Sequence, residues 1–156
     1  MSATLELFDL IGDLARRRYQ LADKSFATLG LTHTEARLLS LLAAAGGESA
    51  QDALSNQLTV DRTNAGRALT RLDEAGYLER RKDSGDKRAN RVHITAQGRK
   101  TVTAIARLRK EMAAAFFGEM TSDEAARIVR LFRERLALPA PASGERTRAA
   151  GGPSVQ

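Results

Sequence analysis

The chain has 156 residues, a formal net charge of +6 and a hydrophobic content of 42%. This length suits one domain, or one domain with an added oligomerisation element, and the apolar content can supply a core. The positive charge favours an anionic partner. The sequence has no cysteine, which excludes a thiolate redox sensor, an iron–sulfur cluster and every cysteine-based zinc site.

The N-terminus has neither the basic start nor the long apolar run of a signal peptide, and no stretch approaches a membrane span. We therefore expect a cytoplasmic protein with no membrane partner. An enzyme is disfavoured, because the sequence has no cysteine nucleophile, no histidine and acid cluster, no glycine-rich phosphate loop and no HExxH helix. We predict no cofactor and no metal site.

Helix starts are indicated where a serine or threonine is followed three residues later by an acidic residue, because each side chain can cap an exposed backbone amide. Such pairs are Thr32 with Glu35, Ser49 with Asp52, and Thr121 with Glu124, and Asp61 is a further candidate N-cap. With apolar residues at helical spacing and glycine stops, they predict helices over about 4–29, 33–45, 50–57, 61–75, 99–120 and 122–137.

The predicted helix 61–75 is amphipathic. Its apolar face, at spacings of three, four and seven, is Ala65, Ala68, Leu69 and Leu72, and its polar face holds Thr63, Arg67 and Thr70. Only residues 58–60 separate it from the helix before, which is typical of a helix-turn-helix. Strands over about 77–81 and 90–94 flank a turn-rich Asp83-Ser84-Gly85-Asp86 and predict a hairpin wing.

The basic residues coincide with this helix and hairpin. Residues 60–100 hold eleven Lys and Arg against six Asp and Glu, a surplus of five. A helix with one apolar face and one polar face, followed by a basic finger, suits adjacent grooves of duplex DNA. The alternative is that Arg62, Arg67 and Arg71 form a solvated face paired with Asp73 or Glu74, which contributes little.

In element order, residues 5–137 resemble the MarR-type regulators, a family of dimeric bacterial winged-helix transcription factors. The motifs that carry the resemblance are Leu31-Thr32, Asp61-Arg62-Thr63-Asn64, Leu72 with Gly76-Tyr77-Leu78-Glu79-Arg80, Asp83-x-x-Asp86-Lys87-Arg88, and Ile94-Thr95-Ala96-Gln97-Gly98. The chain departs from the family at Glu35, where the family often has Gln, and at Ile94, where it commonly has Leu, and neither residue is expected to touch the DNA-reading positions. It also lacks the cysteine of peroxide-sensing members and has too few histidines for zinc-sensing members.

The resemblance implies a mainly α fold with a small β wing. Residues 1–30 would be an N-terminal dimerisation helix, 31–98 the winged helix-turn-helix DNA-binding domain, and 99–138 the C-terminal dimerisation helices. Residues 139–156 hold all three prolines and are expected to be a disordered tail. The dimer interface would include Leu7, Ile11, Phe116, Phe117, Ile128 and Phe132, although a stripe cannot distinguish a partner from intrachain packing.

The resemblance also implies a set of DNA contacts. Major-groove contacts would come from Arg62, Thr63, Asn64 and Arg67, and phosphate contacts from Thr70, Arg71, Lys82, Lys87 and Arg91. Arg88 would enter the minor groove, oriented by Asp86. A bidentate guanine contact from Arg67 or Arg62 would give about 1–3 kcal/mol of discrimination. Alternatively, Asp83 and Asp86 serve only as turn residues that bond to nearby backbone amides.

Family members often have an effector pocket for small aromatic or phenolic ligands between the dimerisation helices and the DNA lobes. The residues near it here would be Arg16, Tyr19, Phe26, His33 and Arg37. From the residues alone, His33 fits a surface position and Tyr19 fits a core position with its hydroxyl at the surface. Some members respond to no known ligand, so an unliganded repressor is the alternative.

We therefore expect a sequence-specific transcriptional regulator, a ligand-responsive repressor that binds a pseudo-palindromic operator in double-stranded DNA as a homodimer. Two alternatives are a winged-helix adaptor that binds another protein and a non-specific DNA-coating protein.

Overall fold

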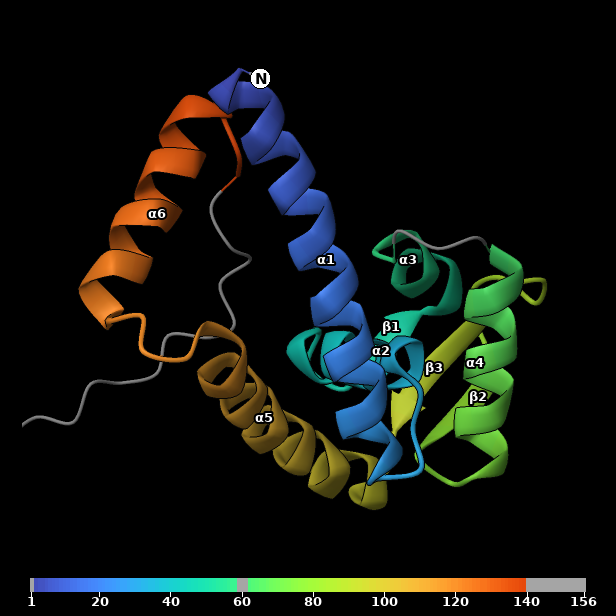
Figure 1. Cartoon of the computed structure of the whole chain (residues 1–156). Helices are drawn as coiled ribbons and strands as arrows, with labels where there is room; N and C mark the ends of the chain where they lie inside the picture. The colour runs from blue at the N-terminus through green and yellow to red at the C-terminus, as the bar shows by residue number, and fades with distance from the viewer. Residues whose placement is uncertain (1, 59–61, 140–156) are drawn as a thin grey trace, which may run out of the picture. The chain divides into compact units, whose positions relative to one another are not determined.

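The computed structural model describes residues 2–58 and 62–139 (Figure 1). These residues form α1 (Ala3–Ala27), α2 (His33–Ala44), β1 (Glu48–Ala50), α3 (Gln51–Asn56), α4 (Arg62–Glu74), β2 (Leu78–Lys82), β3 (Asn90–Ile94), α5 (Ala96–Phe117) and α6 (Ser122–Arg135). The chain divides into two units, residues 1–118 and 119–156, and each is described by itself. The predicted N-cap Asp61 and residues 140–156 of the predicted tail lie outside the described residues.

The predicted mainly α fold with a small β wing is confirmed. Two of the three predicted capping boxes form as expected. The Thr32 hydroxyl accepts from the Glu35 amide at 3.2 Å while the Glu35 carboxylate accepts from the Thr32 amide at 2.9 Å. Thr121 and Glu124 make the same reciprocal pair, at 3.2 and 2.8 Å. Each box therefore satisfies two backbone amides that have no partner within the helix.

The predicted capping box of Ser49 and Asp52 is wrong. Ser49 lies in β1, where its hydroxyl donates to the Ala50 carbonyl at 3.1 Å. The helix α3 begins at Gln51, and its N-cap Ala50 makes no side-chain cap hydrogen bond. The sequence reasoning missed β1, because a strand of three residues is too short to show an alternating pattern.

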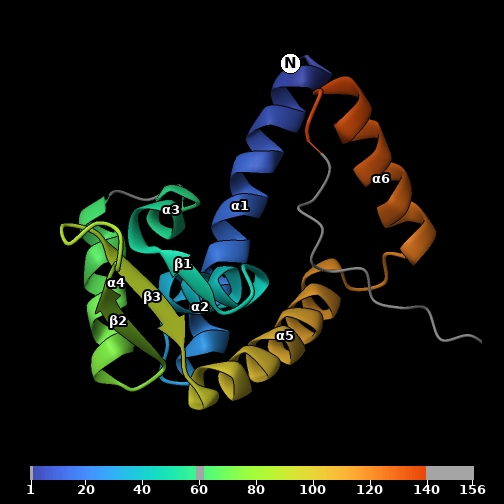
Figure 2. The same ribbon diagram turned by 180° about the vertical axis from the view of Figure 1, so that it is seen from behind.

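The three strands form an antiparallel sheet in the order β1-β3-β2, which Figure 2 shows from behind. Glu48 pairs with His93 across β1 and β3, and Leu78 pairs with Ile94 across β2 and β3. The alternation of a strand buries Leu78 and Val92 against the helices, whereas charged residues occupy the opposite face. The central position of β3 therefore ties the wing to the segment before α3.

The core of the first unit is built around α2, which contacts α1, α3, α4 and α5. The largest fully buried side chains come from α2, α3, α4, α5 and the strands β2 and β3, and are Leu38, Leu39, Leu42, Leu54, Leu69, Leu72, Leu78, Val92 and Ile105. The helix-turn-helix pair α3 and α4 is therefore fixed to one side of α2, while α1 and α5 also pack against it.

The end of α4 is set by Gly76, whose φ of 82° lies in the left-handed region that favours glycine. The Gly76 amide donates to the Asp73 carbonyl at 3.0 Å, and the Tyr77 amide donates to the Leu72 carbonyl at 2.9 Å. The Thr95 hydroxyl then donates to the Gly76 carbonyl at 2.7 Å. This stop joins the end of α4, the start of β2 and the start of α5.

The N-terminal half of α1 leaves large apolar side chains exposed in the single chain: Leu5, Leu7, Phe8, Leu10 and Ile11. The helix α6, in the second unit, also exposes Ile128, Val129 and Leu131. Across residues 2–58 and 62–139, none of the helices combines the length and the apolar character needed to cross a membrane.

Candidate nucleic-acid interface

The helix α4 has one buried and one exposed face. Ala65, Ala68, Leu69 and Leu72 are all buried, as the predicted apolar stripe requires. Thr63 and Asn64, which precede this stripe, and Arg67, which falls within it, are exposed. Because residues three and four apart share a helix face, the predicted groove-reading side chains lie together on the outer surface. Arg62 begins the same helix.

The next turn of α4 is engaged by the protein itself. The Thr70 hydroxyl donates to the Gly66 carbonyl at 3.1 Å. The Arg71 Nη2 lies 2.6 Å from Glu35 Oε1 on α2, and the Glu35 side chain is only 6% exposed. The alternative interpretation, in which Arg71 pairs with Asp73 or Glu74, is therefore wrong, and Asp73 instead pairs with Arg80 at 2.9 Å.

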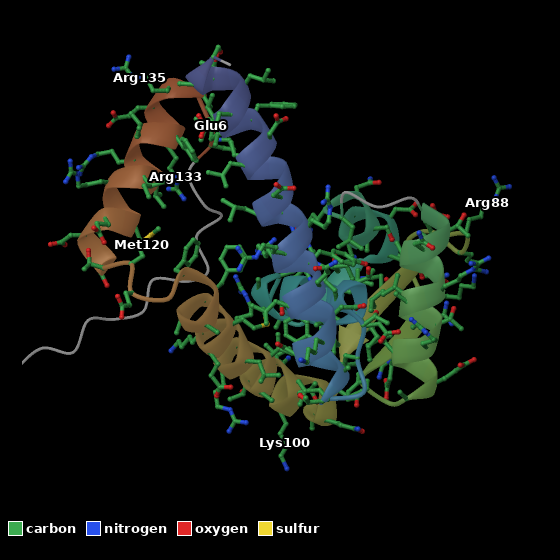
Figure 3. All side chains as sticks on the ribbon, viewed as in Figure 1. Glu6, Arg88, Lys100, Met120, Arg133 and Arg135 are labelled. Atoms are coloured by element: carbon green, nitrogen blue, oxygen red, sulfur yellow. The ribbon has the colours of Figure 1, made fainter. Side chains whose placement is uncertain are left out.

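The hairpin of β2 and β3 is shaped by two aspartates. Asp83 accepts from the Gly85 amide and Asp86 from the Arg88 amide, each at 2.9 Å. These are the turn-forming bonds of the alternative interpretation. The contact of Asp86 with Arg88 is therefore a hydrogen bond to the Arg88 backbone amide and not to its side chain. The Arg88 side chain is exposed and projects away from the ribbon (Figure 3). Lys82 and Lys87 are exposed as well.

Arg91, a predicted phosphate contact, is held at the base of the wing. Its Nε donates to Glu48 Oε1 on β1 at 2.6 Å, and its Nη1 lies 4.0 Å from Asp83 Oδ2. His93, two residues further along β3, has its Nδ1 3.8 Å from Glu48 Oε2. Arg91 therefore connects β1, β3 and the start of the wing loop within the protein.

The wing loop lies beside the N-terminal end of α4 in both ribbon views (Figures 1 and 2). The exposed polar residues of the first turns of α4 and the exposed Lys87 and Arg88 of the loop therefore belong to one side of the molecule. Such an arrangement can offer a helix to a wide groove and a basic finger to the groove beside it.

A second candidate site lies where α1 meets α2. The His33 ring lies 5.1 Å from the Tyr19 ring, edge to face, and 6.2 Å from the Phe26 ring, stacked. The His33 amide donates to Asp23 Oδ1 at 3.3 Å. Among the described residues, His33 Nδ1 is buried without a hydrogen-bond partner. The ring is therefore not the free surface side chain expected from the sequence.

The structure brings together three of the five predicted effector residues, Tyr19, Phe26 and His33. Phe26 is buried in the core, whereas Tyr19 is 54% exposed and is not the core residue that the sequence allowed. Arg37 is exposed and acts on His33 through its charge. Arg16 instead pairs with Asp13 at 3.4 Å on the surface of α1.

The model of the MarR family matches residues 29–89, which run from the end of α1 to the wing loop. Over these residues, which are less than half of the chain, the protein is similar to the MarR family. A comparison with curated proteins found no sequence match.

Solved structures with the same fold include MarR-family regulators. A cysteine-to-serine variant of Escherichia coli MarR, complexed with operator DNA, has a TM-score of 0.73 and 24% identity, covering 85% of this chain and 95% of that one. A MarR-like regulator from Bacillus cereus has a TM-score of 0.76 and 19% identity, covering 86% and 96%. An organohalide-sensing regulator bound to 2,4-dichlorophenol has a TM-score of 0.75 and 14% identity, covering 88% and 81%. At these identities the likeness shows the fold.

The sequence reasoning missed the two acidic side chains that hold predicted DNA contacts. Glu48 lies in the overlooked strand β1, and no motif indicated its pairing with Arg91. Glu35 was noted only as a departure from the family that does not touch the DNA-reading residues. Its pairing with Arg71 of α4, a predicted phosphate contact, was missed. The presence of Glu at position 35, where the family often has Gln, was the feature of the sequence that could have pointed to this pair.

The histidine at the α1–α2 junction predicts a loss of stability in acid. Burial, with the nearby Arg18 and Arg37 guanidinium groups, lowers the pKa of His33 below its ordinary 6.5, and Asp23 partly opposes this. His33 therefore binds a proton more readily in the unfolded chain than in the folded one. Its contribution to the stability of the fold is fully present above pH 6.5 and is lost as the pH falls through the pKa of the folded state. Urea unfolding between about pH 8 and pH 5, at fixed protein concentration, should show this loss.

Replacing His33 with Gln should reduce the acid loss. An unchanged acid loss in the His33→Gln variant would contradict this assignment.

Proposed function

We propose that the chain is a sequence-specific transcriptional regulator, a repressor that binds a pseudo-palindromic operator as a homodimer. The observation that supports this most strongly is the exposed Thr63, Asn64 and Arg67 face of α4 beside a basic wing loop. The chain shares its fold with an E. coli MarR variant that was solved with operator DNA. In this proposal α4 enters the major groove and the wing enters the minor groove.

The two basic groups have different tasks in the proposal. Arg67 is exposed and can place its planar guanidinium against guanine O6 and N7, a contact that distinguishes base pairs. Arg62, Thr63 and Asn64 complete the major-groove set, and Lys82 and Lys87 face the phosphates. The Thr70 hydroxyl donates its proton to the Gly66 carbonyl and would have to give up this bond to contact a phosphate. Arg88 extends from the wing tip, where a cation suits the negative potential of a narrow A·T minor groove. Arg71 and Arg91 are already paired with carboxylates of the protein, Glu35 and Glu48, before any contact with DNA.

A homodimer follows from how much DNA one helix can read. A single recognition helix contacts too few base pairs to select an operator in a genome, whereas two helices one turn of DNA apart can do so. The exposed apolar residues of α1, 42% to 74% accessible in the single chain, provide a surface that a second copy would cover.

Replacing Ile11 with Asp should convert the dimer to a monomer, because a charge would be placed in an apolar interface. Sedimentation equilibrium measures the change directly. Gln20→Asp, at an exposed polar position of the same helix, is the matched control and should remain a dimer. A wild-type monomer at micromolar concentration, or a dimeric Ile11→Asp variant, would contradict the interface.

We further propose that a small aromatic or phenolic effector acts at the α1–α2 junction. The exposed Tyr19 ring and the unpartnered His33 Nδ1 would meet the ring and the hydroxyl of a phenol. An organohalide-sensing regulator of the same fold binds 2,4-dichlorophenol. Calorimetric titration with 2,4-dichlorophenol should show binding that His33→Gln weakens, and equal heats for both proteins would reject this site.

The regulator proposal is tested by selecting duplexes from a random library with the full chain. We expect an enriched inverted repeat whose half-sites lie about one helical turn apart. Enrichment of a single half-site would contradict the proposal that the chain binds its operator as a homodimer. Retention of all sequences alike would favour a coating protein, and no retention would favour a protein-binding adaptor.

A further inference from the structure

One buried carboxylate connects the start of α2 to α4. Glu35 Oε2 accepts from the Thr32 amide at 2.9 Å, which fixes the carboxylate in the capping box. Its other oxygen, Oε1, lies 2.6 Å from Arg71 Nη2. Glu35 is 5% exposed, whereas the Arg71 side chain is 60% exposed. A fixed, buried acid therefore holds a cation that is itself at the surface of α4.

This pair has a direct relation to the groove-reading face. Arg71 lies four residues after Arg67, so the two side chains occupy neighbouring positions on the helix surface. Leu69 and Leu72, on the opposite face, are fully buried against the core. The apolar contacts hold α4 against α2, and the ion pair adds one directional contact that resists rotation of the helix about its axis.

The charge of Glu35 also has a cost for DNA binding. A carboxylate beside Arg71 neutralises a cation that could otherwise contact a phosphate. A buried acid, however, needs its partner, because an uncompensated charge in the interior is strongly unfavourable. Arg71 is thus more firmly committed to Glu35 than an exposed pair would be.

We propose that Glu35 is a positioning residue for sequence reading: it fixes the rotation of α4 through Arg71 and thereby withholds Arg71 from the phosphates. The proposal rests on the proposed function as a DNA-binding regulator. It predicts that Arg71 does not contact a phosphate, and that its pairing with Glu35 holds Thr63 and Arg67 in the orientation that recognises bases.

The test substitutes Glu35→Gln, which keeps an oxygen that can accept from the Thr32 amide but removes the charge. We expect the preference for a library-selected duplex over its shuffled sequence to fall about tenfold, within the range that one base contact provides. Affinity for the shuffled duplex should rise. The magnitude of its salt dependence, measured as the slope of log K against log salt, should increase by about 1.8 per dimer, because each of the two protomers neutralises one further phosphate.

The matched control is Glu111→Gln on α5. Glu111 is exposed and pairs with Arg107, so this variant changes the net charge equally and also frees an arginine. It should alter neither the preference nor the slope. In Glu35→Gln/Arg71→Gln the slope should return to the wild-type value, which identifies Arg71 as the released cation. Urea unfolding of each variant verifies that the protein is folded.

Three results would overturn the proposal. An equal gain in affinity for both duplexes would mean that Glu35 only competes with phosphate for Arg71. An equal loss for both, with an unchanged slope, would mean a purely structural role. No change in preference or slope would mean no role in binding. A wild-type protein without sequence preference would reject the regulator proposal itself, and that result is visible before any variant is compared.

Discussion

Replacing Arg67 with Ala is expected to remove much of the preference for the operator while leaving non-specific binding nearly intact. Arg67 is exposed on the outer face of α4, away from the buried stripe, so its loss should not disturb the core. A bidentate guanine contact contributes about 1–3 kcal/mol of discrimination, or roughly 5- to 150-fold in relative affinity. Fluorescence anisotropy with the selected duplex and with its shuffled sequence measures the ratio.

Arg107→Ala is the control, since Arg107 is an exposed arginine on α5 and its loss changes the net charge equally. Arg88→Ala provides the complementary comparison, because its loss should matter most at sites with A·T-rich flanks. Equal reductions for every duplex with both Arg67→Ala and Arg88→Ala would contradict the division of tasks between helix and wing.

Replacing Gly98 with Ala is expected to destabilise the fold by about 3 kcal/mol, the upper range for overpacking. A Cβ at Gly98 would overlap the carbonyl oxygen of Tyr77 and lie 2.7 Å from Ile94 Cγ1. Because one of these neighbours is the backbone of Tyr77, either the start of α5 or the segment that enters β2 would have to move. Urea unfolding measures the free energy difference.

Gly12→Ala is the matched control. Gly12 also lies in a helix, but a Cβ there would meet nothing within 4 Å. This change should therefore stabilise the chain by up to about 1 kcal/mol, as alanine usually does in a helix interior. Similar stabilities for Gly98→Ala and the wild type would show that the approach of Tyr77 to α5 is not tight.

Much of the fold could be predicted because the starts and ends of its helices are determined by a few neighbouring residues. The capping pairs Thr32–Glu35 and Thr121–Glu124 and the stop at Gly76 are each decided within a few residues. The strand β1 could not be predicted in this way. It exists because Glu48 and Ser49 pair with His93 and Val92, more than forty residues away, and its own sequence carries no alternating pattern.

The candidate site likewise has a part that follows from local sequence and a part that depends on tertiary packing. The exposed face of α4 follows from helical periodicity, and the turn of the wing follows from aspartates that bond to nearby amides. The partners of Arg71 and Arg91 follow from neither. Glu35 and Glu48 meet these arginines only after helices and strands have packed, so the sequence could not distinguish cations that are free for DNA from cations held within the protein.

The most direct test of the account is the affinity of the full chain for a library-selected duplex and for its shuffled sequence, measured by anisotropy across a salt series. We predict a preference of about a thousandfold or more, with two protomers for each site. Equal affinity for both duplexes, with a steep salt dependence, would contradict the account, because it would mean that α4 and the wing bind the phosphate backbone without reading sequence.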